Sequence, residues 1–198
     1  MTDRADLRAR LRSQRARLTP SERIAAASAV ATTLEQLPEF LVDQCVAGYW
    51  AVGGELPLHV VLAALMSRGQ RYHLPVLMPG KRLSFAPWRR GIELQPNRYG
   101  VPEPLCAAPD LLAPEALELV FVPLVGFDRR GFRLGTGGGY YDRTFAFLNG
   151  AERPAQPVLV GIGYSFQELP TLPEQAWDVR MDFVATEREL IDCTKRDT

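Results

Sequence analysis

The apolar residues of the chain fall into short continuous runs separated by segments with helical spacing. Such short apolar runs, flanked by glycine and proline, are typical of buried strands. A strand that is apolar along its whole length is covered on both faces, which favours a parallel sheet. Pro79-Gly80 predicts a turn between two of the runs. Strands are therefore expected at 45–52, 72–78, 83–88, 118–125, 158–162 and 183–186.

Helix-start signals lie between these runs. Thr19-Pro20-Ser21-Glu22 has the form of a capping box with proline in the first turn. Pro57 opens a second helical segment, which Gly69 ends. The basic opening segment also shows near-helical spacing, at Leu7, Leu11 and Leu18. Defined helices are expected over 20–37, 57–66 and 140–148.

The alternation of strands and helices predicts the fold class. It indicates one α/β domain over residues 1–198, in which a mainly parallel central sheet is covered on both sides to give three α/β/α layers.

Composition limits the environment and the partners of the chain. Its 23 Lys+Arg balance 23 Asp+Glu, so no global field attracts nucleic acid or an anionic membrane, and neither is expected as a partner. No apolar run reaches the roughly 20 residues of a membrane span. Three widely spaced cysteines argue against a disulfide framework or a zinc site and favour the reducing cytoplasm. We expect a cytoplasmic monomer, with an organelle presequence in the arginine-rich opening as the alternative.

Five of the sixteen glycines lie between Gly131 and Gly139, after a predicted strand and before a predicted helix. Glycines there let backbone amides turn toward an anion, and the start of a helix adds partial positive charge. The segment therefore predicts a phosphate site, and Arg133 and Arg143 can neutralise the bound charge. A flexible connection without a ligand is the alternative.

Asp142 follows the glycines in the first predicted helical turn. A carboxylate beside a phosphate repels it unless a cation intervenes, so Asp142 predicts a magnesium ion between them. Simple stabilisation of the helix N-terminus is the alternative. The string ends in Gly-Tyr-Tyr rather than Gly-Lys-Ser/Thr, which disfavours a Walker loop, and it also departs from the usual setting of the dinucleotide fingerprint.

The string from Arg133 to Arg143, preceded by Pro-Leu-Val-Gly-Phe-Asp at 123–128, closely resembles the signature of the 5-formyltetrahydrofolate cyclo-ligase (methenyltetrahydrofolate synthetase) family. Three further segments resemble family motifs in the same order, and the resemblance covers nearly the whole chain. They are Tyr49-Trp-Ala-Val-Gly-Gly-Glu55, Gly100-Val-Pro-Glu-Pro104, and Gln167 with Leu172-Pro173 and Trp177-Asp178.

The resemblance implies an activity. The family uses ATP and Mg²⁺ to close the N5-formyl group of 5-formyltetrahydrofolate, free or polyglutamylated, onto N10. The products are 5,10-methenyltetrahydrofolate, ADP and phosphate, and the formyl oxygen is phosphorylated on the way. The implied fold is like that of sugar-phosphate isomerases and CoA transferases.

The resemblance also assigns residues. Asp142 and Asp178 would hold Mg²⁺, and Trp50 and Glu55 would contact the folate, although Trp50 as core filler and Glu55 as a solvated turn residue are alternatives. The folate would also touch Thr136, Gly137, Gly138, Gly139 and Tyr140. ATP would be bound by Arg4, Arg8, Arg133, Leu134, Gly135, Thr136, Gly137, Gly138, Gly139, Tyr140 and Tyr141, and catalysis would involve Arg133, Tyr140 and Arg143.

The chain departs from the family pattern at two motifs. Arg4 stands where the family has lysine in a Lys-x-x-x-Arg pair, and Trp177-Asp178 stands where it often has His-Asp. These changes leave a folate-binding protein without turnover as an alternative, and a phosphate-handling enzyme such as a sugar-phosphate isomerase as another. Outside the motifs, Arg12 and Arg15 are expected on a solvated basic helix face, and His59 and His73 are expected to be packed or surface residues.

Overall fold

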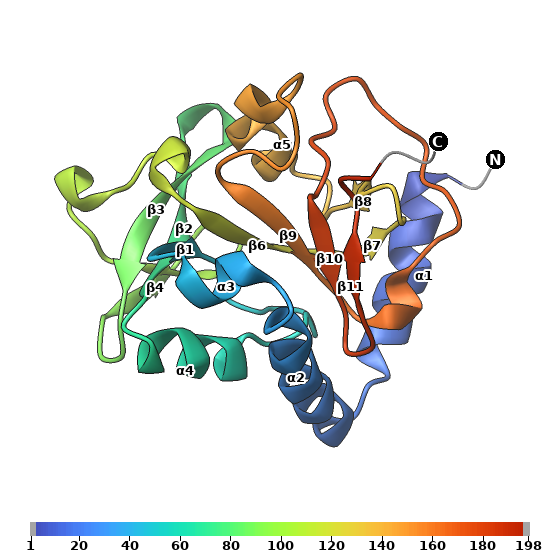
Figure 1. Ribbon diagram of the computed structural model, residues 1–198, viewed down its shortest axis with the longest axis horizontal. Coiled ribbons are helices and arrows are strands. Elements are labelled where there is room, and N and C mark those ends of the chain that lie inside the picture. The colour runs from blue at the N-terminus through green and yellow to red at the C-terminus, as the bar shows by residue number, and fades with distance from the viewer. Residues whose placement is uncertain (1–2, 196–198) are drawn as a thin grey trace.

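The computed structural model describes residues 3–195 and is built around one large sheet. Its strands are β1 (Cys45–Ala47), β2 (Arg71–Met78), β3 (Arg82–Trp88), β6 (Leu119–Pro123), β9 (Val158–Ile162), β10 (Phe183–Ala185) and β11 (Leu190–Asp192). They lie in the order β11-β10-β9-β6-β1-β2-β3 (Figure 1). The five inner strands are parallel, and only the two edge strands, β3 and β11, pair antiparallel. The mainly parallel sheet is confirmed.

Helices cover both faces of this sheet. They are α1 (Arg4–Ala16), α2 (Pro20–Leu34), α3 (Pro38–Val42), α4 (His59–Ser67) and α5 (Tyr140–Thr144). Figure 1 shows α2, α3 and α4 along one face, where their apolar side chains share a core with the sheet. The other face packs against Phe145 and Leu148, which follow α5. The predicted three-layer α/β/α arrangement is confirmed. Within residues 3–195, no helix is long and apolar enough to cross a membrane.

Helix α1 lies apart from these layers, at one end of the molecule (Figure 1). It packs on a two-stranded ribbon of β7 (Gly126–Phe127) and β8 (Arg133–Leu134). Leu7 and Leu11 form a small core there with Leu134 and neighbouring apolar residues. A second ribbon, of β4 (Leu94–Pro96) and β5 (Pro102–Pro104), contacts β2. The sequence predicted neither ribbon.

The strand order reverses at the centre of the sheet. From β1 the chain proceeds to β2 and β3 in one direction, and from β6 it proceeds to β9 and β10 in the other. The neighbouring strands β1 and β6 therefore send their following loops to opposite sides. In open α/β sheets such a reversal leaves a crevice at the carboxyl ends of the strands, which is where ligands bind.

The N-terminal boundary of α2 follows the sequence prediction, but its C-terminal boundary does not. The Thr19 hydroxyl accepts from the Glu22 amide (3.3 Å), and the Glu22 carboxylate accepts from the Thr19 amide (2.7 Å), so the capping box is confirmed. The helix ends at Leu34 rather than at residue 37. Pro38 starts the separate helix α3, and a residue before proline is disfavoured in the helical conformation, so Leu37 is extended.

Two further elements end at least four residues before their predicted ends. The strand predicted over 45–52 ends at Ala47, and the Tyr49 hydroxyl beyond it donates to the Leu56 carbonyl (2.6 Å). The helix predicted over 140–148 is broken after Thr144 and continues only as a 3₁₀ turn, Ala146–Leu148. The predicted contribution of a helix N-terminus to phosphate binding is correspondingly smaller, since α5 has only five residues.

The capping box provides a test of the fold. Thr19→Ala removes the side-chain acceptor for the Glu22 amide, so we expect the free energy of unfolding to fall by about 1 kcal/mol. Urea denaturation measures the change. Thr32→Ala, at an exposed position in the same helix, is the control and should change the stability by less than about 0.5 kcal/mol. Equal losses in the two variants would contradict a specific contribution of the cap.

Candidate active site

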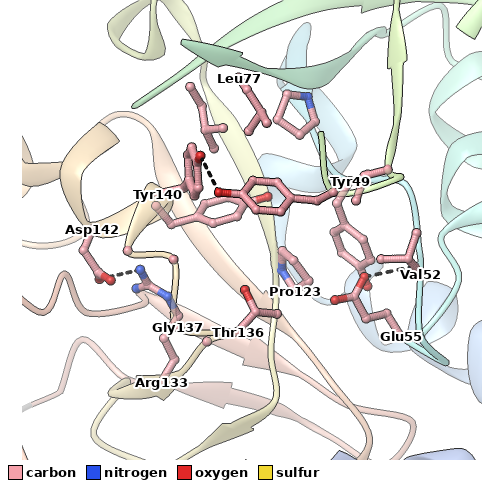
Figure 2. Close-up of a pocket in the computed structure, with 18 of the residues that line it drawn as sticks. Tyr49, Val52, Glu55, Leu77, Pro123, Arg133, Thr136, Gly137, Tyr140 and Asp142 are labelled. Atoms are coloured by element: carbon pink, nitrogen blue, oxygen red, sulfur yellow. Dashed lines mark hydrogen bonds and ion pairs between the residues drawn. The ribbon is translucent and has the colours of Figure 1, made fainter. Parts of the chain in front are cut away.

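A pocket of about 540 Å³ opens at the reversal between β1 and β6. Tyr49 and Trp50 follow β1, and Pro123 is the last residue of β6. Figure 2 shows Arg133 and Asp142 on one side of the pocket and Tyr49, Val52 and Glu55 on the other. The lining includes these residues and Arg4, Arg8, Pro75, Leu77, Leu83, Asn97, Tyr99, Val101, Glu103, Gly135, Thr136, Gly137, Gly138, Gly139, Tyr140, Tyr141, Trp177 and Asp178.

One face of α1 carries a row of arginines that contact the pocket walls. Arg8 donates to the Gly135 carbonyl (2.9 Å), and Arg12 donates to the Thr136 carbonyl (3.2 Å). Arg15 is only 4% exposed and donates to the carbonyls of Gly53 (3.0 Å) and Leu124 (3.4 Å). The prediction of a solvated basic face was therefore wrong for Arg15, whereas Arg12 is exposed as predicted. Residues spaced three or four apart share one helix face, so a regular row of arginines could have indicated this contact.

The charge of Arg8 is available to an anion. Its contact is a backbone carbonyl rather than a carboxylate. Partial burial and the nearby positive charges of Arg4 and Arg12 lower the pKa of Arg8, so the arginines repel one another in the absence of a ligand. Among the described residues, the buried Nε of Arg4 also has no hydrogen-bond partner. Phosphate oxygens would offset the repulsion between the arginines and accept a hydrogen bond from the Arg4 Nε.

The glycine loop has a backbone that favours glycine at two positions. Gly137 has φ = +104° and Gly139 has φ = +69°, conformations that other residues rarely adopt. Arg143 donates to the carbonyls of Gly138 (3.0 Å) and Gly139 (3.1 Å) and does not line the pocket. Arg143 thus holds the backbone of the loop, and its expected catalytic role stays a prediction.

Two residues expected in the phosphate site make contacts within the protein. Leu134 is fully buried and packs with Leu7 and Leu11, and its carbonyl accepts from the Val125 amide (2.9 Å). Leu134 does not line the pocket, and its expected contact with ATP stays a prediction. Arg133 does line the pocket, but it is 7% exposed and donates to Asp142 and to the Val179 carbonyl. Its charge is already balanced by Asp142.

The two predicted metal ligands lie on one wall of the pocket. Asp142 Oδ1 is paired with Arg133 and accepts from the Val179 amide (3.3 Å). Asp178 Oδ2 is paired with Arg4 (3.0 Å) and accepts from the Gln175 amide (3.1 Å). Within residues 3–195 no cluster of three or more His, Cys, Asp or Glu side chains is present. Phosphate-bound Mg²⁺ is commonly held by one or two carboxylates plus phosphate oxygens and water, so these two aspartates fit such an ion.

The opposite half of the pocket is more apolar and contains Glu55. Its carboxylate accepts from the Val52 amide (3.1 Å), which fixes the turn at Gly53-Gly54, and burial raises its pKa. Trp50 is 39% exposed and packs edge-to-face on Trp88 (6.3 Å between ring centroids). A partly exposed indole and an acidic group are suited to an aromatic ring whose edge carries hydrogen-bond donors. Neither alternative, core filler for Trp50 or solvated turn for Glu55, describes this arrangement.

The tip of the β4–β5 ribbon forms a side of the pocket that the sequence did not reveal. Tyr99 Oη lies 3.1 Å from Tyr140 Oη, and Arg98 also donates to the Tyr140 hydroxyl. Hydrogen bonds from Tyr99 and Arg98 lower the pKa of Tyr140. The Asn97 side chain holds this tip by accepting from the amides of Tyr99 (2.8 Å) and Val101 (3.1 Å). The Pro-Asn-Arg-Tyr-Gly string at 96–100 is a turn signal that could have indicated the ribbon.

Other residues of the four motifs have structural roles. Glu103 accepts from the Leu77 amide (3.1 Å) and from Asn97 (2.7 Å), which holds β5 on β2. Gln167 is 1% exposed and donates to the carbonyls of Leu124 and Val125 at the end of β6. His73, as expected, is packed, with Nδ1 3.1 Å from the Val46 carbonyl. Cys45, Cys106 and Cys193 are all free.

Comparisons with known proteins agree on one family. The model of the 5-formyltetrahydrofolate cyclo-ligase family matches residues 1–187. A 5-formyltetrahydrofolate cyclo-ligase of Escherichia coli (strain K12) is 34% identical over 89% of this chain and 96% of its own length. Its Haemophilus influenzae counterpart is 32% identical, over 89% and 93%. The NMR structure of Aquifex aeolicus 5,10-methenyltetrahydrofolate synthetase is 29% identical, with a TM-score of 0.81 over 98% of this chain and 95% of that one.

The burial of Glu55 generates a pH-dependent prediction. A carboxyl whose pKa is raised on folding binds more protons in the folded state, so its cost to stability appears as the pH rises through that raised pKa. Glu55→Gln removes this cost. We expect the free energy of unfolding of Glu55→Gln, minus that of the wild type, to increase from pH 4 to pH 8.

Denaturation series at several pH values measure this difference. The control is Glu35→Gln, which removes a carboxylate from an exposed position at the end of α2 and reports the effect of losing surface charge alone. If the free energy of unfolding of Glu55→Gln, minus that of the wild type, falls with rising pH, burial does not raise the pKa of Glu55.

Proposed function

The chain belongs to the 5-formyltetrahydrofolate cyclo-ligase family, and we propose that it catalyses the ATP-dependent cyclisation of 5-formyltetrahydrofolate to 5,10-methenyltetrahydrofolate, with release of ADP and phosphate. One observation carries the proposal. A single pocket joins a half suited to a nucleoside triphosphate, with Arg4, Arg8 and the glycine loop, to a half suited to an aromatic ring system, with Trp50 and Glu55.

The proposed reaction requires the two substrates, one in each half of the pocket, to come into contact. A formamide oxygen is a poor leaving group, so the γ-phosphoryl group of ATP is first transferred to the formyl oxygen, and ADP leaves. N10 then attacks the formyl carbon, its proton is lost, and the C–O bond breaks as phosphate departs with the oxygen. The protein needs to hold the two substrates in line and balance the charge on the phosphates, which is the usual basis of catalysis in phosphoryl transfer.

The residues of the pocket can be assigned to these tasks. Arg8 and Arg4 would bind phosphate oxygens, and the glycine loop would present backbone amides to them. Tyr140, which adjoins the glycine loop and whose hydroxyl lies 3.1 Å from that of Tyr99, would lie between the two substrates. Its hydroxyl, whose pKa is lowered, is suited to hydrogen bonding with the reacting oxygen.

Asp142 and Asp178 are the residues that would hold Mg²⁺. The ion would offset negative charge on the triphosphate as the γ-phosphoryl group moves. Asp142 also has a structural role, because it is the ion-pair partner of the buried Arg133. Replacing it would leave a buried guanidinium without its counter-charge and would lower stability as well as turnover. Asp178 is the better test position, since its partner Arg4 is more exposed.

A direct assay tests the proposed function. Purified protein mixed with 5-formyltetrahydrofolate, ATP and Mg²⁺ is expected to produce the near-ultraviolet absorbance of the methenyl product and one ADP per turnover. Omitting ATP should abolish the signal. Folded protein that binds both substrates without forming product would contradict the proposal and favour a folate-binding protein, whereas product formation without ATP would contradict the phosphoryl-transfer mechanism.

The metal assignment has its own prediction. Asp178→Asn keeps the size of the side chain but loses its charge, so the Mg²⁺ concentration for half-maximal turnover should rise roughly 10-fold or more. Asp110→Asn, an exposed position outside the pocket, is the control and should leave the Mg²⁺ requirement unchanged. An unchanged requirement in Asp178→Asn, with the fold intact by thermal melting, would remove Asp178 from the metal site.

A further inference from the structure

Trp177 is the most exposed of the large aromatic side chains in the described part of the chain. It is 64% exposed and lines the same pocket as the glycine loop. The other two tryptophans differ, since Trp50 and Trp88 pack edge-to-face on each other and Trp88 also packs on Tyr72. None of the aromatic pairs within residues 3–195 includes Trp177. Packing of the protein therefore does not explain an indole at this position.

The backbone that carries Trp177 is held at several points. The Asp178 amide donates to the Gln175 carbonyl (2.9 Å), and the Gln175 amide donates back to the Asp178 carboxylate (3.1 Å). Arg4 holds the same carboxylate (3.0 Å), and the next amide, of Val179, is bound by Asp142 (3.3 Å). An exposed side chain on a turn fixed in this way is presented to a ligand at little cost in backbone entropy.

We propose that Trp177 is the platform on which the purine base of the nucleoside triphosphate stacks. The proposal rests on the proposed function, because it places the triphosphate in the half of the pocket that contains Arg4, Arg8 and the two aspartates. Trp177 directly precedes Asp178, so the indole lies beside the expected position of the phosphates. The half expected to hold the folate has its own partly exposed indole, Trp50.

A stacking platform has a characteristic selectivity. Stacking uses the face of the base and does not read the hydrogen-bonding groups on its edge, so it favours large rings without distinguishing closely similar ones. ATP, GTP and ITP should therefore bind with affinities that differ little, and CTP and UTP should bind more weakly. Loss of a stacked aromatic typically weakens binding roughly 5- to 100-fold.

Titration calorimetry in Mg²⁺ can test the platform without turnover. We expect Trp177→Ala to raise the dissociation constant of ATP roughly 5- to 100-fold and Trp177→Phe to stay within about 3-fold of the wild type, because a phenyl ring keeps a stacking face. Trp177→Leu is the matched control, since it keeps an apolar side chain without that face, and it should resemble Trp177→Ala. Inorganic tripolyphosphate has no base, so its affinity should be the same in all four proteins.

Steady-state kinetics then separate the two substrates. Trp177→Ala should raise the KM for ATP and leave the KM for 5-formyltetrahydrofolate unchanged. A rise in the folate KM alone would assign the indole to the folate, and an unchanged ATP affinity in Trp177→Ala would overturn the platform. Equal weakening of ATP and tripolyphosphate would overturn it as well, because the indole would then act through the phosphates.

The experiments distinguish a failure of the proposed function from a failure of the stacking proposal. Wild-type protein that binds ATP but forms no product contradicts the function, while the calorimetric comparison of the variants still decides whether Trp177 binds the base. Wild-type protein that binds tripolyphosphate and ATP with equal affinity overturns the platform even if it is a fully active cyclo-ligase.

Discussion

The pocket depends on the row of arginines on α1. Arg4, Arg8, Arg12 and Arg15 connect this one helix to Asp178, to the glycine loop and to the turn after β1. These segments are irregular and distant in sequence, and their contacts with α1 hold them together. Burying the Arg15 guanidinium is costly unless carbonyl groups accept its hydrogen bonds, so the helix position and the loop conformations stabilise each other. The small apolar core under Leu7 and Leu11 holds the helix in place.

Charge in the pocket is partly balanced within the protein and partly left for a ligand. Two arginines are paired with the two aspartates, and Arg8 contacts only a carbonyl among the described residues. Under the proposed function, the two aspartates would hold the cation and the arginines would bind phosphate oxygens. Glu55 keeps a carboxylate in a partly buried position, which costs stability and is consistent with a binding role.

The fold brings the two halves of the pocket together. The reversal of strand order between β1 and β6 brings the turn after β1, with Trp50 and Glu55, next to the segment after β6, with the glycine loop. The β4–β5 ribbon then closes one side, where Tyr99 meets Tyr140. The half lined by Trp50 and Glu55 thus comes mainly from the first part of the chain. The half lined by the glycine loop comes from the second part, and α1 contacts both.

The sequence alone was sufficient for the class of fold, the family, the inner strands, the Thr19 capping box and the pocket positions of Asp142, Trp50 and Glu55. These depend on local patterns and on ordered motifs, which are visible in one dimension. It did not predict that Arg15 is buried, that Leu134 belongs to the core, or that Arg143 closes the loop. It also missed the ribbon that carries Tyr99, because its short strands have little apolar patterning. Such features depend on contacts between residues that are distant in sequence, up to 174 positions apart for Arg4 and Asp178. Only the packed structure determines which charged and aromatic side chains find partners within the protein and which remain available to a ligand.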